Sequence, residues 1–244
     1  MAAAVTPLLE VAGLGKRFGG FVALSAIDLS VEQGERVGLI GPNGSGKSTL
    51  VNCLSGTLRN DKGSVRFAGH RLDGMAPHRR TRLGLSRSFQ LPRPFGGMNV
   101  VDNLRIPLEY ALRERGDAAA IGARCAALLG SVGLETKGRQ FPADLTQIEM
   151  RKLELARAMA AEPKLLIADE AMAGLSNNEV DDILALLLRL NADGVTVIMI
   201  EHIMRAVMKF SQRLIVLVAG RKIADGVPDA VIRDPEVERA YLGE

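Results

Sequence analysis

The chain has 244 residues, of which 47% are hydrophobic, enough to bury the core of one domain or of two closely joined lobes. Its 31 basic and 28 acidic residues leave a net charge of +3 and are spread along the chain, without the basic arm or stripe typical of nucleic-acid binding. The longest apolar runs have the length of strands, which excludes a membrane-spanning helix.

The N-terminus and the cysteines indicate a reduced, cytosolic setting. Residues 1–7 lack the basic and long apolar regions of a signal peptide. Cys53 and Cys125 show neither the pairing of a disulfide framework nor the spacing of a metal site.

The first third of the chain predicts short strands around a glycine-rich loop. Alternating or apolar runs predict strands at residues 8–11, 21–30, 36–40 and 64–68. We expect a small antiparallel layer that flanks a nucleotide-binding core.

The segment 41–49 has the pattern of a phosphate-binding loop, because it follows a strand and opens a helix predicted over 50–58. Its glycines let backbone N–H groups close around phosphate oxygens, and the helix points its positive end at the anion. Lys47 then reaches the β and γ phosphates, and the Ser48 hydroxyl ligates Mg²⁺. A glycine-rich turn is the alternative. The residues predicted to bind nucleotide here are Gly41, Pro42, Asn43, Gly44, Ser45, Gly46, Lys47, Ser48 and Thr49.

Helical periodicity replaces the strand pattern between residues 91 and 161. Helices are predicted at 100–111, 118–132 and 147–161, separated by Gly and Pro breaks. The chain therefore divides into a core of residues 1–90 and 162–244 and an inserted helical lobe of residues 91–161. Gln90 lies at the first junction, ahead of a loop that two prolines stiffen, and an ordinary surface loop is its alternative reading.

The last third alternates strands with helices. Strands are predicted at 165–168, 195–200 and 213–218, and helices at 179–190 and 203–210. This alternation predicts an α/β fold with a mostly parallel sheet covered on both faces.

Three polar side chains follow two of these strands. Asp169 is placed to bind the Mg²⁺ shell and Glu170 to accept a proton from an attacking water, since neighbouring side chains of a strand point in different directions. An acidic cap at a strand-to-helix turn is the alternative. His202 follows the next strand, where a satisfied polar residue is the alternative.

Taken in order, these segments resemble the ATP-binding subunit of an ABC transporter over nearly the whole chain. The resemblance implies a phosphate-loop, RecA-like fold and Mg²⁺-dependent ATP hydrolysis that uses Lys47 and Glu170. It also implies that Phe18 stacks on adenine. By the same resemblance Gln90 joins the metal site to the membrane partner, and His202 contacts the γ phosphate.

Segments 17–20, 173–179, 200–202 and 240–244 narrow the resemblance to the branched-chain amino acid uptake group, which includes importers of urea, amides and small aromatic acids. The implied partners are membrane-spanning permease subunits at the cytoplasmic face of the inner membrane and, indirectly, a periplasmic solute-binding protein. A second ATP-binding subunit is expected in a heterodimer, with a homodimer as the alternative. A soluble ABC-type ATPase is the alternative function, but such relatives carry a coiled-coil insertion or two nucleotide domains, which 244 residues do not hold.

The signature segment departs from this family. Residues 145–149 read Leu-Thr-Gln-Ile-Glu in place of Leu-Ser-Gly-Gly-Gln. Thr146 keeps a hydroxyl for the partner's γ phosphate, but Gln147 and Ile148 add side chains where close approach is expected. Thr146 and Glu149 also have the spacing of a helix capping box. We expect both roles, with the contact to the partner's nucleotide weakened. Ser176 is a further departure, at a position where many relatives have aspartate.

Overall fold

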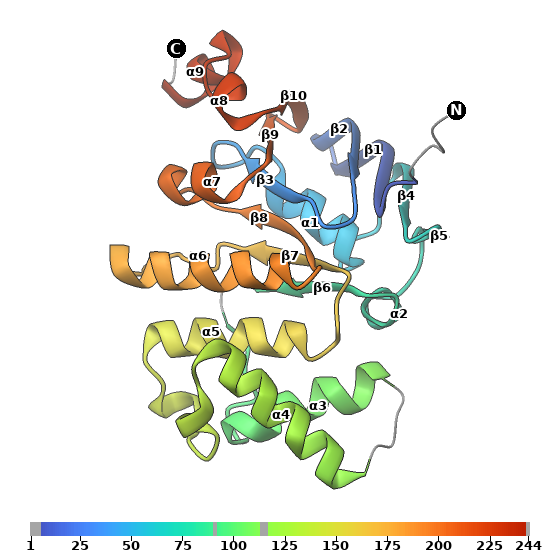
Figure 1. Ribbon diagram of the computed structural model, residues 1–244. Coiled ribbons are helices and arrows are strands. Elements are labelled where there is room, and N and C mark those ends of the chain that lie inside the picture. Colours follow the sequence, from blue (N-terminus) through green and yellow to red (C-terminus); the bar gives the residue numbers. More distant parts are fainter. Residues whose placement is uncertain (1–5, 90–91, 113–116, 243–244) are drawn as a thin grey trace, which may run out of the picture.

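The computed structural model describes residues 6–89, 92–112 and 117–242. An antiparallel sheet with the order β2-β1-β4-β5 forms one side of the molecule (Figure 1). This sheet is the predicted flanking layer. Its strands are β1 (Leu9–Phe18), β2 (Phe21–Val31), β4 (Lys62–Phe67) and β5 (His70–Arg71).

A six-stranded sheet with the order β10-β9-β3-β8-β7-β6 forms the centre, and it is parallel except at its β10 edge. The predicted parallel core is confirmed, but β6 and β10 were not predicted. Polar residues fill most of β6, and no residue of β10 is fully buried, so neither strand carries a clear apolar pattern. The strands are β3 (Arg36–Ile40), β6 (Leu85–Ser88), β7 (Leu165–Asp169), β8 (Thr196–Ile200), β9 (Arg213–Val218) and β10 (Arg221–Gly226).

Helices cover both faces of the central sheet. The described helices are α1 (Lys47–Ser55), α2 (Pro77–Arg82), α3 (Val100–Leu112), α4 (Ala118–Val132), α5 (Gln147–Met159), α6 (Asn177–Ala192), α7 (Met204–Phe210), α8 (Pro228–Val231) and α9 (Pro235–Leu242). Helix α4 matches its prediction, whereas α1 begins at Lys47 rather than at residue 50 and ends before Gly56, where φ is 86°. The short helices α2, α8 and α9 were not predicted. Their lengths are too small for the helical period to show.

Alternating side chains of the buried strands pack into two separate hydrophobic cores. One face packs against α1 and the antiparallel sheet, and the other packs against the helices α5, α6 and α7. This alternation is the period of two that an extended strand imposes. The first core includes Leu165, Ile167, Ile198, Ile200, Ile215 and Leu217, and the second includes Leu166, Ala168, Val197, Met199, Leu214 and Val216.

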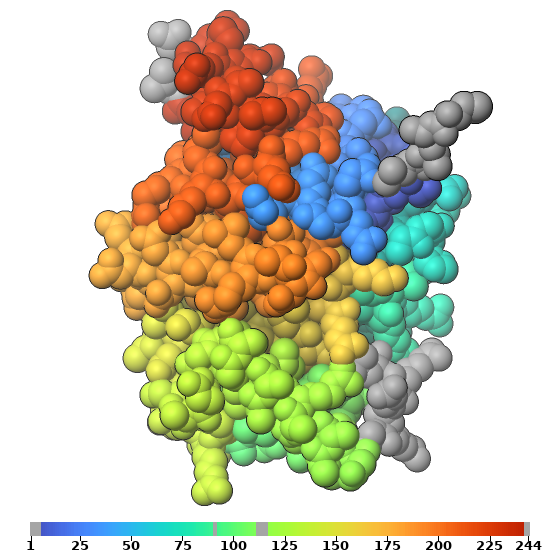
Figure 2. All heavy atoms as spheres, in the orientation of Figure 1, coloured from blue at the N-terminus to red at the C-terminus, as the bar shows by residue number. Residues whose placement is uncertain are grey.

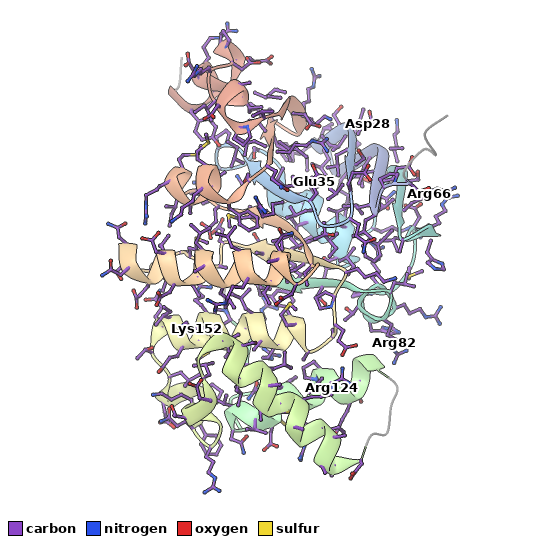
Figure 3. The ribbon with its side chains drawn as sticks, in the orientation of Figure 1. Asp28, Glu35, Arg66, Arg82, Arg124 and Lys152 are labelled. Atoms are coloured by element: carbon purple, nitrogen blue, oxygen red, sulfur yellow. The ribbon has the colours of Figure 1, made fainter. Side chains whose placement is uncertain are left out.

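Helices α3, α4 and α5 pack on one another at one end of the molecule, and the C-terminal segment forms the other end (Figures 1 and 2). The division at residues 90–91 and 161–162 stays a prediction. Of the charged residues labelled in Figure 3, Asp28 and Arg66 lie on the antiparallel sheet, and Arg124 and Lys152 lie on α4 and α5 at the helical end. Within the described residues, no helix is long and apolar enough to cross a membrane.

Candidate active site

The glycine-rich loop joins β3 to α1 at the carboxyl edge of the parallel sheet, where ligands of α/β proteins usually bind. A Cβ on Gly41 would lie 2.1 Å from the Leu217 carbonyl oxygen, and one on Gly46 would lie 2.8 Å from the Ala23 oxygen. At Gly44 a Cβ would meet nothing within 4 Å, but φ is 78°. Gly41 and Gly46 are therefore required by contacts within the protein itself. The sequence pattern predicts in addition that the loop glycines let the backbone approach phosphate oxygens closely.

The Lys47 ammonium lies inside this loop. Its Nζ donates to the carbonyl oxygens of Gly41 (2.6 Å) and Pro42 (3.1 Å), and the side chain is almost fully buried. Burial lowers the pKa of Lys47, and the nearby carboxylates of Glu170 and Asp169 oppose that shift. The cation is thus held where phosphate oxygens can replace the carbonyl contacts.

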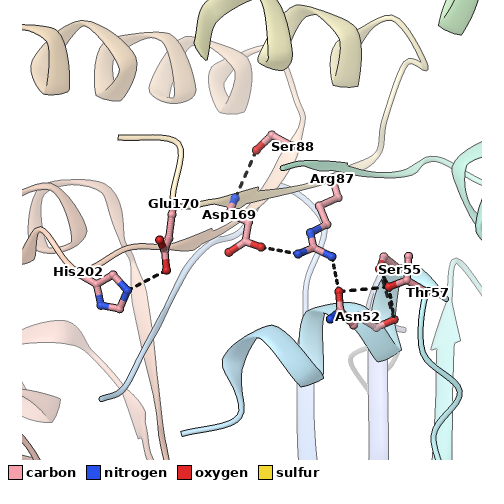
Figure 4. A network of polar contacts seen from close by, with 8 residues as sticks. All are labelled: Asn52, Ser55, Thr57, Arg87, Ser88, Asp169, Glu170 and His202. Atoms are coloured by element: carbon pink, nitrogen blue, oxygen red, sulfur yellow. Dashed lines mark hydrogen bonds and ion pairs between the residues drawn. The ribbon is translucent and has the colours of Figure 1, made fainter. Parts of the chain in front are cut away.

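Asp169 is the last residue of β7, and Glu170 follows it outside the strand with a left-handed backbone, so the predicted strand alternation does not set the direction of Glu170. The two carboxylates nevertheless meet different partners (Figure 4). Asp169 Oδ2 accepts a hydrogen bond from Arg87 Nη2 at 2.6 Å. Glu170 has a φ of 48°, and its Oε1 lies 2.9 Å from Nε2 of His202. The structure therefore brings Glu170 and His202 together and places Asp169 in a separate buried contact.

The loop after Glu170 is fixed by residues that sequence reasoning did not single out. The backbone N–H of Met172 donates to Glu201 Oε1 at 2.8 Å, and burial raises the pKa of this carboxyl. Arg151, on α5, donates through Nη2 to the Ala173 carbonyl oxygen at 3.1 Å. The sequence signal for Glu201 is a carboxylate that directly follows an apolar strand, whereas Arg151 lies among other charged residues of α5 and carries no such signal.

The predicted capping box of the signature segment is confirmed. Thr146 N donates to Glu149 Oε2 at 2.9 Å, and Glu149 N donates to Thr146 Oγ1 at 3.4 Å, at the first turn of α5. The Gln147 side chain turns toward the chain's own loop, where Nε2 lies 3.4 Å from the Ala173 oxygen. The Gln147 side chain also packs closely on Gly174, whose φ of 79° lies in the left-handed region that favours glycine.

Phe18 ends β1 with 48% of its surface exposed, and the Lys16 ammonium lies 5.5 Å from the centre of its ring. An exposed ring at a strand end leaves a face open to stacking. Gln90 lies outside the described residues. Ser176, the other departure from the family pattern, donates through N and Oγ to the Glu179 carboxylate at the start of α6.

The C-terminal helix α9 contacts β10 and shares a cavity with Ile40, the last residue of β3. A half-open, mostly apolar cavity of about 410 Å³ is lined by Ile40, Met204 and Tyr241 among others. Burial raises the pKa of the Tyr241 hydroxyl, and the Gly41 backbone partly opposes that shift. The C-terminal segment therefore approaches the first glycine of the phosphate loop.

Comparison with known proteins adds independent findings. The family described as ABC transporter matches residues 24–173, and the family described as branched-chain amino acid ATP-binding cassette transporter matches residues 221–244. The chain is 37% identical to the high-affinity branched-chain amino acid transport ATP-binding protein BraF of Pseudomonas aeruginosa and 35% identical to LivG of Escherichia coli, over 98% of each chain. The ADP conformation of MJ1267, an ATP-binding cassette of an ABC transporter, matches with a TM-score of 0.87 and 31% identity, covering 98% of this chain and 100% of that one.

Proposed function

The chain belongs to the ABC transporter ATP-binding family, and from this premise we propose that it powers an importer for branched-chain amino acids or related small polar or aromatic solutes. Such a subunit is an ATPase. The observation that carries the ATPase chemistry is the approach of Glu170 to His202, beside a loop that holds the buried Lys47. The match of residues 221–244 to the branched-chain amino acid family supports the class of solute.

We assign each of these three residues, Lys47, Glu170 and His202, a role in ATP hydrolysis. Lys47 and the loop N–H groups bind the β and γ phosphates. Glu170 accepts a proton from water while the water oxygen attacks the γ phosphorus and the bond to the β-phosphate oxygen breaks. His202 orients Glu170 in the observed contact and reaches the γ phosphate when the nucleotide is bound.

The donors proposed for Mg²⁺ are the Ser48 hydroxyl, one Asp169 carboxylate oxygen and the Gln90 amide. Hydroxyl and carboxylate oxygens are the hard ligands that this ion prefers, so the residues fit it. Among the described residues, no group of three or more His, Cys, Asp and Glu side chains could hold a metal. We therefore propose that phosphate oxygens complete the shell. When bound, the ion neutralises charge on the phosphates.

The proposed partners are permease subunits at the cytoplasmic face of the membrane, a second ATP-binding subunit in a heterodimer and, indirectly, a periplasmic solute-binding protein. The test is reconstitution with the permease subunits in vesicles. Solute-loaded binding protein should stimulate ATP hydrolysis. Hydrolysis that neither the permease nor the binding protein changes would favour the soluble ATPase instead.

The loop around Phe95 is proposed to contact the permease. Phe95 and Met98 are 41% and 39% exposed, although the fully buried Asn103 fixes their backbone. A stiff loop that presents apolar side chains suits a docking surface. Phe95→Cys should cross-link to a permease subunit, whereas Val227→Cys, on the C-terminal segment and 64% exposed, should not. Capture from residue 227 alone would reject this surface.

Phe18→Ala should weaken ATP binding by roughly 1 to 3 kcal/mol if the ring stacks on adenine. Phe21 pairs with Phe18 across the β1–β2 turn and is 64% exposed, so Phe21→Ala is a matched control. Nucleotide titration of the two variants checks this. Loss of affinity in Phe21→Ala alone would move the stacking role to Phe21.

A further inference from the structure

Arg87 places a guanidinium between the Asp169 carboxylate and helix α1 (Figure 4). Nη2 lies 2.6 Å from Asp169 Oδ2, and Nη1 donates to Asn52 Oδ1 at 2.6 Å. The side chains of Arg87 and Asp169 are only 12% and 6% exposed. The pair is therefore largely removed from water.

The fold holds this arrangement from several sides. The parallel pairing of β6 with β7 sets Arg87 opposite Ile167, next to the end of the strand that carries Asp169. The Asn52 oxygen also accepts from the Thr57 hydroxyl at 3.2 Å, which fixes the acceptor. The Phe89 ring centre lies 5.3 Å from the guanidinium carbon. A planar guanidinium held at two nitrogens is oriented as well as charged.

A buried ion pair is weak evidence of stabilisation, because desolvation of both charges can offset their attraction. Asp169 is also the carboxylate to which we assign the metal shell. One of its oxygens is engaged by a cation on the protein itself. A dication that approaches the same carboxylate meets the positive charge of Arg87 at close range, and nearby Lys47 adds to that repulsion.

We propose that Arg87 is a built-in counter-ion that neutralises Asp169 in the nucleotide-free protein, so that Mg²⁺ is accepted only together with nucleotide phosphates. This rests on the proposed metal role of Asp169. Arg87 acts through Asp169 and is a positioning residue. It keeps Oδ2 occupied and leaves the other oxygen for the metal shell.

The test measures the melting temperature of nucleotide-free protein with millimolar Mg²⁺ and with choline chloride at equal ionic strength. Wild type should show no difference between the two salts. Arg87→Gln keeps a polar side chain but removes the charge, so Mg²⁺ should raise its Tm by roughly 2 to 4 °C in a saturable way. Arg87→Lys, which keeps the charge, should behave as wild type. The double variant that combines Arg87→Gln with Asp169→Asn should lose this Mg²⁺-dependent rise in Tm.

A purely structural ion pair makes a different prediction, namely that Arg87→Gln is destabilised equally in both salts. That result, or a wild-type response as large as that of Arg87→Gln, would overturn the proposal. If Arg87→Gln does not fold during expression, it is refolded from urea in each salt. A larger folded fraction in Mg²⁺ supports the proposal, and equal fractions reject it.

The metal role of Asp169 is checked separately. Asp169→Asn in the otherwise unchanged chain should weaken the Mg²⁺ dependence of ATP binding. If that dependence is unchanged, the metal assignment under the proposed function is wrong. If Asp169→Asn loses the Mg²⁺ dependence of ATP binding but Mg²⁺ does not change the Tm of nucleotide-free Arg87→Gln, the metal role of Asp169 stands and only the counter-ion role of Arg87 is wrong.

Discussion

Replacing Glu170 by Gln should leave ATP binding intact and lower ATP turnover by roughly 10² to 10⁴, the usual contribution of a positioned base. The amide keeps the size of the side chain and a carbonyl oxygen facing His202, but it cannot accept the proton of the attacking water. Phosphate release by the assembled transporter and equilibrium ATP binding are the two measurements. Asp181→Asn removes a carboxylate from an exposed ion pair between α6 and α7 and should change turnover little. Wild-type turnover in Glu170→Gln would show that another group is the base.

The same substitution tests whether the two nucleotide sites of the proposed heterodimer hydrolyse ATP at different rates. In this chain Gln147 and Ile148 replace the close-packing glycines of the signature, so the partner's nucleotide meets the poorer contact. The site built on Lys47 and Glu170 should be the faster one. Loss of Glu170 should therefore reduce transport ATPase activity more than loss of the partner subunit's counterpart. Equal losses, or a fully active homodimer of this chain, would reject the asymmetry.

Replacing Arg80 by Met should destabilise the protein by roughly 3 to 5 kcal/mol, because it removes four hydrogen bonds to carbonyl groups, of which, within the described residues, only the Leu72 oxygen keeps another donor, the Met75 N–H. The Arg80 guanidinium donates to the carbonyl oxygens of Cys53 (2.7 Å), Leu54 (2.8 Å), Leu72 (2.8 Å) and Met75 (3.0 Å). Two of these belong to the last turn of α1, the helix that begins with Lys47. Burial lowers the pKa of Arg80, and the charge of Asp73 opposes that shift.

Urea unfolding of Arg80→Met checks this expectation. Arg79→Met is the matched control, since Arg79 lies on the same short helix α2 with its side chain exposed. Its free energy of unfolding should stay within about 0.5 kcal/mol of wild type. An equally small change in Arg80→Met would mean that water replaces the guanidinium at the carbonyls.

Local patterns in the sequence were sufficient for much of the fold and for several features of the candidate site. The phosphate loop and the capping box at Thr146 each lie within a few consecutive residues, so their spacing predicts their local geometry directly. The acidic pair was predicted to alternate along one strand, but β7 ends at Asp169 and Glu170 has a φ of 48°. Strands β3 and β9 and helix α4 match their predicted bounds because each carries a full period of apolar residues or a clear break.

The tertiary structure alone decided which distant residues meet. Arg87 and Asp169 lie 82 residues apart, and only the parallel register of β6 with β7 brings them into contact. Arg80 is one of several arginines in its segment, and its burial depends on how α2 lies against the end of α1. The requirement for glycine at position 41 comes from the Leu217 carbonyl oxygen on β9. Sequence periodicity reports which face of an element is buried, whereas the partner across that face is set by sheet order and register.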